Sequence, residues 1–307
     1  MRQPSFLKPG DKIGIVAPAR KVSRDEIKPG LEILKGWGFV PVEGNNLYGS
    51  NHQFSGTDNE RAKDFQEMLD NPEIKAIISA RGGYGCMRII DQLNFEKFVQ
   101  QPKWITGFSD LTVFHSHLHQ QYQVQTLHSI MMFNMNPGRF DMTSVESMGK
   151  ALTGLGTNYE YEGSFKSLQR DGKARGEVIG GNLSLLYALS NSTSDIETNG
   201  KILFIEDLDE YLYHVDRMMI QLKRAGKLSG LAGLIVGGMN DMKDNEIKFG
   251  KSAEEIIREA VNGYSYPVCF GFPAGHQKDN RALILGAIAE LNVGSSISLN
   301  YINNGGA

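Results

Sequence analysis

Short apolar runs alternate with amphipathic segments through the first 130 residues, and this alternation is the strongest constraint on the fold. β-Branched or apolar runs, the pattern of buried strands, occupy residues 12–19, 39–42, 76–80, 104–108 and 124–129. Segments with helical periodicity lie between them, at residues 27–34, 57–69, 87–93 and 111–121. Strands separated by helices of this length predict parallel βαβ units with right-handed crossovers.

The pattern changes between residues 134 and 157, where NMNPGRFD and TGLGTN bracket a short amphipathic segment. Glycine, proline and polar residues in this density are typical of a linker. Further strand patterns follow at residues 201–206, 231–238, 267–272 and in the C-terminal stretch, with helical patterns at 211–225 and 253–261. We therefore expect an α/β domain over residues 1–140, a linker region over 141–165, and a second α/β domain with a partly antiparallel sheet over 166–307.

Composition narrows the class of protein. The 307 residues carry a formal net charge of −3, which argues against a protein whose main task is to grip nucleic acid or an anionic membrane. The two cysteines cannot form a disulfide framework. The N-terminus lacks the apolar core of a signal peptide or a spanning helix. These features favour a cytoplasmic enzyme without a membrane or nucleic-acid partner.

The stretch WITGFSDLTVF carries the clearest chemical signal. A strand leads into Gly107, Phe108 and Ser109, and a helical pattern begins at once. A tight strand-to-helix turn of this kind is a nucleophile elbow, which lifts a serine hydroxyl clear of the sheet and needs a small residue two positions before the serine. Leu111 departs from the GxSxG pattern, which has glycine at that position. Taken alone, the same residues also fit an ordinary helix cap.

A glycine-rich turn, ARGGYG, follows the strand at residues 76–80. It matches neither a P-loop nor a well-formed dinucleotide fingerprint. Backbone amides at the ends of neighbouring parallel strands are well placed to stabilise an oxyanion, and we assign that role to the amides of Gly83 and Asp110. A tight turn that needs positive φ is the alternative for Gly83.

A nucleophilic serine needs a base, and His276 is the best placed of the seven histidines. It follows the strand pattern PVCFGF on a loop with glycine and proline, and such loops carry reactive groups in α/β proteins. His115 and His119 share a helix face, but no HExxH pattern accompanies them and no metal site is expected.

The base in turn needs an acid, and KILFIEDLDEY supplies four candidates. Glu206 ends the apolar strand and is favoured because the strand orients it rigidly, although the sequence alone does not choose among the four. The other three, Asp207, Asp209 and Glu210, are interpreted as an acidic first turn that compensates the dipole of the following helix.

These segments occur in an order that resembles a known family. IVAPA, ARGGYG, GFSDLT, GGNLSLL, FIED and GFPAGH together resemble the LD-carboxypeptidases, the murein tetrapeptide carboxypeptidases of serine peptidase family S66, nearly from end to end. The resemblance implies a flavodoxin-like N-terminal domain and a C-terminal swivelling β/β/α-type domain, with the active site in the cleft between them.

The resemblance also implies roles for individual residues. By motif, Ser109 corresponds to the nucleophile, Glu206 to the acid and His276 to the base, with the amides of Gly83 and Asp110 as oxyanion donors. The implied reaction is release of the terminal D-alanine from a murein tetrapeptide during cell-wall recycling, by a homodimer without metal or organic cofactor. Arg81 lies near the oxyanion segment and is a candidate to bind the terminal carboxylate of the peptide.

Two other functions stay open. Some members of the same family are immunity peptidases that cleave an aminoacyl group from a nucleotide antibiotic, and motifs do not separate the two activities. A non-catalytic ligand-binding α/β protein is the alternative from another class, and the retention of all three triad side chains argues against it. A dinucleotide-dependent enzyme is disfavoured because no acidic residue follows a proper GxGxxG at the usual distance.

Overall fold

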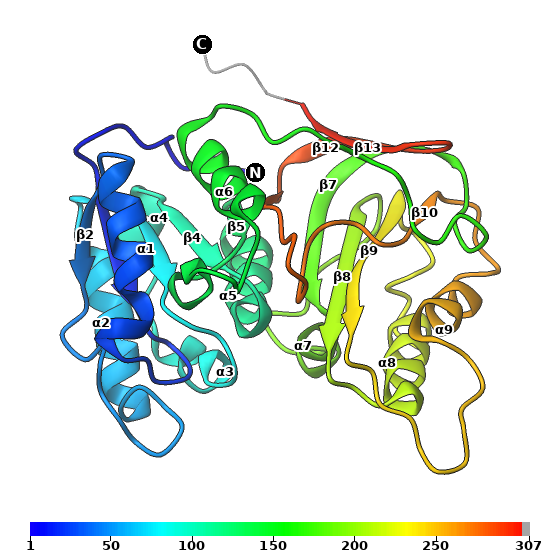
Figure 1. The fold of residues 1–307 in the computed structure, drawn as a ribbon, viewed down its shortest axis with the longest axis horizontal. Helices are drawn as coiled ribbons and strands as arrows, with labels where there is room; N and C mark the ends of the chain where they lie inside the picture. The colour runs from blue at the N-terminus through cyan, green and yellow to red at the C-terminus, as the bar shows by residue number, and fades with distance from the viewer. Residues whose placement is uncertain (303–307) are drawn as a thin grey trace.

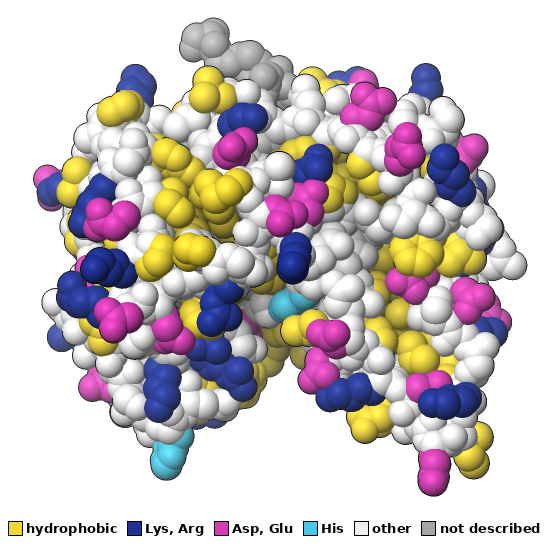
Figure 2. Space-filling model, viewed as in Figure 1, with side chains coloured by type: hydrophobic (Ala, Val, Ile, Leu, Met, Phe, Trp, Pro, Cys, Tyr) yellow, Lys and Arg dark blue, Asp and Glu magenta, His cyan; other side chains and the backbone are white. Residues whose placement is uncertain are grey.

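A computed structural model describes residues 1–302 and places two β-sheets side by side, each with its own helices. The N-terminal half, blue to green in Figure 1, and the C-terminal half, green to red, meet along the middle of the molecule. A deep notch separates them along the lower edge of the space-filling view (Figure 2). No helix within residues 1–302 is long and apolar enough to cross a bilayer.

The first sheet lies in the N-terminal half. Its strands are β1 (Lys12–Val16), β2 (Val40–Glu43), β3 (Ile74–Ser79), β4 (Trp104–Gly107), β5 (Thr126–His128) and β11 (Leu283–Leu285). In the described chain they stand in the order β11-β5-β4-β3-β1-β2. All neighbours are parallel except β11, which is antiparallel to β5. The order 2-1-3-4-5 of the first five strands is that of a flavodoxin-like sheet.

Helices cover both faces of this sheet, as parallel strands require. They are α1 (Arg24–Gly36), α2 (Asp58–Asp70), α3 (Cys86–Ile89), α4 (Glu96–Gln100), α5 (Thr112–His117) and α6 (Met142–Thr153). Apolar side chains of α1 and α6 pack in one core with β1 and β3, and those of α2 to α5 pack in a second core on the other face. Capping boxes begin α1 at Ser23 and α2 at Thr57, where each side chain accepts the amide of a glutamate three residues on.

The second sheet is mixed. Its strands are β6 (Tyr159–Tyr161), β7 (Gly172–Asn182), β8 (Ile202–Leu208), β9 (Gly233–Asn240), β10 (Val268–Cys269), β12 (Ile288–Val293) and β13 (Ile297–Tyr301). Within residues 1–302 the order is β10-β9-β8-β7-β12-β13-β6. The long β7 joins the parallel part, β7 to β10, to an antiparallel part made by β12, β13 and β6. Helices α7 (Leu183–Ala188), α8 (Leu212–Arg224) and α9 (Ala253–Ala260) cover one face.

The two halves are fixed to one another where β7 ends against α5. The hydroxyl of Thr112, the first residue of α5, accepts a hydrogen bond from the amide of Asn182 at 2.9 Å. Gly181 has φ +144°, and a Cβ there would lie 2.5 Å from the Thr112 hydroxyl oxygen. A larger residue would therefore separate the C-terminal sheet from the helix that begins behind Ser109.

The mixed α/β fold with a partly antiparallel second sheet is confirmed, and the expected linker region contains regular structure. Residues 141–165, expected as a linker, hold the 12-residue helix α6 and strand β6. Helix α6 buries Val145, Met148 and Leu152 in the first core. The amphipathic pattern of this segment therefore forms a packed helix between its glycine- and proline-rich ends. The division at residues 140 and 166 stays a prediction, and its last residues, 303–307, lie outside the described chain.

Candidate active site

Ser109 sits on a strained turn directly after β4. Its φ is +63°, a region that non-glycine residues rarely adopt, and a 3-10 turn over Ser109–Leu111 leads straight into α5. Gly107, two residues earlier, has φ +151°, and a Cβ there would lie 2.8 Å from Cγ of Leu111. The small residue that the elbow pattern requires is thus needed both for its backbone conformation and for the packing of Leu111.

Three residues that the sequence singled out form a continuous chain of hydrogen bonds. Nε2 of His276 lies 3.1 Å from the Ser109 hydroxyl oxygen, and Nδ1 of His276 lies 2.6 Å from Oε2 of Glu206. Because a carboxylate only accepts hydrogen bonds, Nδ1 carries a proton. In the neutral form of the imidazole, Nε2 then presents its lone pair to the hydroxyl of Ser109, which donates to it.

Glu206 is fixed in place before any ligand binds. It is fully buried in β8, at the position where the register between β8 and β9 shifts, and Oε2 also accepts the backbone amide of His276 at 3.0 Å. Gly275 has φ +99°, and a Cβ there would lie 2.6 Å from Cβ of Glu206, so only glycine lets the histidine loop approach so closely. The edge of the His276 ring is further packed by Phe108, with ring centroids 4.8 Å apart.

Charge and burial act in opposite directions on this pair. Burial by itself lowers the pKa of His276, but the charge of Glu206 and its hydrogen bond outweigh burial and raise the pKa above its usual value. Burial likewise opposes the ionised form of Glu206, and the His276 charge and hydrogen bond bring its pKa below the usual value. The pair is thus arranged to stabilise an imidazolium beside a carboxylate.

The two predicted oxyanion donors lie beside Ser109. Gly83 has φ +111° and follows Gly82. A Cβ added to Gly82 would lie 3.4 Å from Cβ of Ser109. In the described chain the amide of Gly83 donates to no protein acceptor. The buried carboxylate of Asp110 accepts the amide of Cys86 at 2.8 Å, which ties the glycine turn to the elbow.

A cavity of about 490 Å³ opens at the Ser109 hydroxyl, between the two halves of the molecule. Arg20, Arg81, Gly83 and Tyr84 line it from the N-terminal half, and Asn182, Asp207, Asp209 and Glu210 line it from the C-terminal half. Figure 2 shows Lys and Arg side chains on the left of the notch and a mixture of Asp, Glu, Lys and Arg side chains on its right. Among the residues that line the cavity, the arginines come from the N-terminal half and the carboxylates from the C-terminal half.

Arg81, the predicted carboxylate ligand, is in this cavity but already has partners. Its Nη1 lies 3.6 Å from Oε1 of Glu26, and its guanidinium stacks on the ring of Phe133 at 4.0 Å from the centroid. The side chain is about a quarter exposed, at 28%. Burial foremost, and then the charges of Arg20 and Arg139, lower the pKa of Arg81, against the opposing charge of Glu26.

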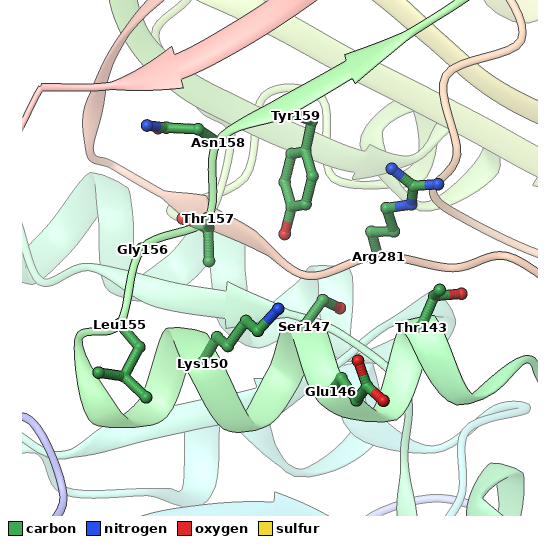
Figure 3. A pocket seen from close by; sticks show the side chains of 10 residues that line it. All are labelled: Thr143, Glu146, Ser147, Lys150, Leu155, Gly156, Thr157, Asn158, Tyr159 and Arg281. Carbon is green, nitrogen blue, oxygen red and sulfur yellow. The ribbon is translucent and has the colours of Figure 1, made fainter.

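A second cavity of similar volume, about 440 Å³, lies over α6 (Figure 3). It is lined by Thr143, Glu146, Ser147, Lys150, Leu155, Gly156, Thr157, Asn158, Tyr159 and Arg281. Its one serine, Ser147, donates to the carbonyl of Ser144 and accepts the amide of Ala282. No histidine faces it among the residues described, so it lacks the serine–base pair found at Ser109.

Asp207 differs from its expected role. It was interpreted with Asp209 and Glu210 as part of an acidic turn before α8, but it is buried and accepts the Asn182 side-chain amide and the Ser184 backbone amide, both at 2.9 Å. It thus stabilises the start of α7, a helix that the strand-and-helix pattern did not predict. Burial and the neighbouring Glu206 charge raise its pKa to about 7.

Both acidic residues after Asp207 are paired, Asp209 exposed and Glu210 partly buried. Asp209 lies 2.7 Å from Nζ of Lys243, and Glu210 accepts from His214 at 2.5 Å, one turn into α8. Glu210 precedes Tyr211, the N-cap residue of α8, so the first turn of this helix holds no acidic residue, contrary to the expected acidic first turn. Asp209 instead occupies a left-handed turn, with φ +65°.

The helical histidines serve packing and hydrogen bonding. The His115 ring lies 2.9 Å from both the carbonyl oxygen of Gly107 and the hydroxyl of Thr126, and burial lowers its pKa to about 3. His119 contacts Glu177 at 3.3 Å. Residues 1–302 contain no group of three or more His, Cys, Asp or Glu side chains arranged to hold a metal ion.

Sequence reasoning missed two polar residues close to the site. Arg20 follows the strand pattern of residues 12–19 and lines the cavity, and His128 ends β5 fully buried, with neither ring nitrogen bonded to a described residue. Burial lowers the pKa of His128 to about 4, against the opposing charge of Glu206. The signal available for both was their place at the carboxyl end of a parallel strand, which is where α/β proteins gather functional groups.

Comparison with known families gives the class to which this fold and site belong. The model of the LD-carboxypeptidase N-terminal domain matches residues 13–129, and that of the LD-carboxypeptidase C-terminal domain matches residues 175–291. The chain belongs to the LD-carboxypeptidase family, as the order of its motifs predicts.

Individual relatives cover nearly the whole chain. The chain is 32% identical over 292 residues to a probable murein peptide carboxypeptidase of Bacillus subtilis, covering 94% of this chain and 91% of the relative. A muramoyltetrapeptide carboxypeptidase structure from Oxalobacter formigenes matches with a TM-score of 0.83 and 27% identity, over 94% and 98% of the two chains. The microcin C7 self-immunity protein MccF, in complex with aspartyl sulfamoyl adenosine, matches with a TM-score of 0.85 and 26% identity, over 97% and 98%.

Proposed function

We propose that this protein is a serine-type LD-carboxypeptidase that releases the terminal D-alanine from murein tetrapeptides. The observation that carries the proposal is the unbroken hydrogen-bond chain from Ser109 through His276 to Glu206, at the base of a cavity large enough for the end of a peptide. The likeness to murein peptide carboxypeptidases supports the choice of substrate.

In the proposed reaction His276 acts as general base. Its Nε2 takes the proton of the Ser109 hydroxyl while Oγ attacks the carbonyl carbon of the scissile bond. The imidazolium that forms carries its second proton on Nδ1, which donates to Glu206 at 2.6 Å, so the positive charge develops beside a buried negative one. This contact stabilises the transition state because neither group has to move.

The carbonyl oxygen becomes negatively charged in the tetrahedral intermediate. We assign its stabilisation to the amides of Gly83 and Asp110, because the first has no acceptor among residues 1–302 and the second opens the helical turn behind Ser109. The intermediate collapses when Nε2 of His276 returns its proton to the leaving amine, and D-alanine departs. A water molecule then attacks the acyl-enzyme while His276 takes its proton. His276 passes that proton to Oγ of Ser109 as the bond to the acyl carbon breaks, and the shortened peptide leaves as a carboxylic acid.

The remaining parts of the proposal rest on the family. Arg81 belongs to the basic wall on which the free carboxylate of the substrate would bind. The chemistry above uses only side chains and backbone amides of this chain, and the proposal includes no metal or organic cofactor. A homodimer in the cytoplasm, where murein peptides are recycled, is the assembly and location that we propose.

A second activity has its own support. The chain is about as similar to the microcin C7 self-immunity protein as to the muramoyltetrapeptide carboxypeptidase, and that immunity protein was solved with an aminoacyl sulfamoyl nucleoside. Because the acyl group attacked by serine is chemically alike in both substrates, the same three residues would serve either reaction. An immunity-type peptidase that cleaves aminoacyl nucleotides is therefore the alternative.

One experiment separates these functions. Purified protein is incubated with a murein tetrapeptide that ends in D-alanine and, separately, with an aminoacyl sulfamoyl adenosine, and the products are followed by mass spectrometry. Release of D-alanine by the wild type and not by Ser109→Ala supports the carboxypeptidase. Cleavage of the nucleoside alone supports the immunity activity. Turnover of neither, with retained binding, would indicate a ligand-binding protein without catalysis.

A further inference from the structure

Arg20 lies at the mouth of the candidate active site and has no charged partner among residues 1–302. It lies after β1, its side chain is exposed, and it lines the cavity that contains Ser109. In the described part of the chain its guanidinium makes no hydrogen bond, and no carboxylate lies within 4.0 Å of it. Arg81, the other arginine of this wall, already contacts Glu26. A free guanidinium beside a reactive serine is available to a ligand.

The backbone of the glycine turn fixes the position of Arg20 relative to Ser109. A Cβ on Gly83 would lie 2.6 Å from Cδ and 3.1 Å from Nε of Arg20, so the arginine side chain rests directly on this glycine. Gly82, the preceding residue, is in turn packed against Cβ of Ser109. Two consecutive glycines therefore separate the serine from the guanidinium, and the amide of Gly83 lies between them.

This spacing suits one end of a peptide. When the carbonyl of the scissile bond points its oxygen at the Gly83 amide, the carboxylate of the last residue lies about one residue length, roughly 3.8 Å, farther along the chain. Arg20 rests on Gly83, the residue that supplies that amide. A planar guanidinium can bind both oxygens of a carboxylate at once.

The opposite wall favours the same orientation. Asp207, Asp209 and Glu210 face the cavity from the C-terminal half. This wall contributes no Lys or Arg to the described lining of the cavity, and its Asp209 is already paired with Lys243. A carboxylate ligand would therefore find its cationic partner in Arg20. A ligand with a free carboxylate therefore gains most when that group lies against the N-terminal wall.

We propose that Arg20 binds the free C-terminal carboxylate of the substrate and so makes the enzyme a carboxypeptidase rather than an endopeptidase. This inference rests on the proposed function, and it makes Arg20, not Arg81, the main specificity-determining residue. Arg81, held by Glu26 and Phe133, supports the positive potential of the wall from behind.

The test compares a tetrapeptide that ends in D-alanine with the same peptide ending in D-alaninamide. Binding of each is measured by calorimetry to Ser109→Ala protein, with Arg20 intact or replaced as Arg20→Gln, Arg20→Lys or Arg81→Gln. Arg224→Gln is the matched control, because Arg224 is exposed at the end of α8, outside the cavity. Turnover by the enzyme with intact Ser109 is measured in parallel.

We expect protein with Arg20 to bind the acid about 10- to 100-fold more tightly than the amide, and Arg20→Gln to abolish that ratio. Arg20→Lys should keep part of the preference, while Arg224→Gln should keep all of it. The inference would be overturned if protein with Arg20 bound the acid and the amide equally, or did not bind the acid. It would also be overturned if Arg81→Gln abolished the preference for the acid and Arg20→Gln did not. Preference for the acid without any turnover would instead overturn only the proposed function.

Discussion

Replacement of Glu206 by glutamine tests how much the buried carboxylate contributes to catalysis. Glu206→Gln keeps the size of the side chain and an oxygen that can accept from Nδ1 and the amide of His276, so the imidazole can stay in place. What disappears is the negative charge beside the imidazolium formed when Ser109 loses its proton. The change therefore acts on the transition state more than on the ground state.

The magnitude follows from the geometry. Nδ1 of His276 and Oε2 of Glu206 are 2.6 Å apart, so the centres of the two delocalised charges are about 4 Å apart. Two unit charges at that distance attract each other by about 4 kcal/mol at an effective dielectric constant near 20. Loss of that attraction should lower kcat roughly a thousandfold. Because the Glu206 charge raises the pKa of His276 above its usual 6.5, the rising limb of kcat/KM should also move to lower pH in the variant.

The assay is release of D-alanine from the tetrapeptide between pH 5 and 9, with a thermal melt to show that the variant is folded. Glu290→Gln is the control, since Glu290 is an exposed glutamate on β12 outside the cavity. A folded Glu206→Gln enzyme with kcat within about threefold of wild type, or with an unmoved pH profile, would refute the reasoning.

Three further perturbations test the supporting structure. Gly107→Ala should lower the free energy of unfolding by about 2–4 kcal/mol and reduce kcat, because the new Cβ meets Leu111. Gly250 also has a positive φ, +86°, but open space around it, so Gly250→Ala should lower the free energy of unfolding by only about 1 kcal/mol. Equal urea midpoints for the two variants would contradict this. Burial and the Glu206 charge raise the pKa of Asp207 to about 7. The folded state therefore retains a proton on Asp207 that the unfolded state loses above roughly pH 4. Because of this difference, the free energy of unfolding should fall as the pH rises from about 4 to 7. Asp207→Asn should flatten that fall in urea titrations, and parallel curves would disprove it. Gly181→Val should separate β7 from Thr112 and lower the melting temperature, and an unchanged melt would show that this contact does not hold the halves together.

Local sequence signals predicted the parts of the site that local backbone geometry determines. Gly107 and Ser109 stand at a strand-to-helix turn, and the structure gives both a positive φ there. Glu206 and His276 were predicted because each follows a strand pattern, and parallel strands bring such positions to one edge of the molecule. The structure then adds their hydrogen bond, which no local pattern contains.

Tertiary contacts determine the features that the sequence did not predict. Asp207 is next to Glu206 in the chain, but side chains alternate along β8, so Asp207 points toward α7 and accepts the Ser184 amide. The sequence pattern did not predict helix α7, and so it did not predict this contact. Helix α6 is stabilised by burial in the first core, which the glycine- and proline-rich sequence around it concealed. Arg20 becomes part of the cavity only through its contact with Gly83, more than 60 residues later in the chain.

The most direct test is the rate of D-alanine release by Ser109→Ala, measured beside wild type and a Ser295→Ala control that changes an exposed serine outside the cavity. We predict that the wild type and the control turn over the tetrapeptide alike, while Ser109→Ala folds normally and loses at least about a thousandfold in kcat. A folded Ser109→Ala protein that retains more than about a tenth of wild-type kcat would contradict the assignment of this hydroxyl as the nucleophile.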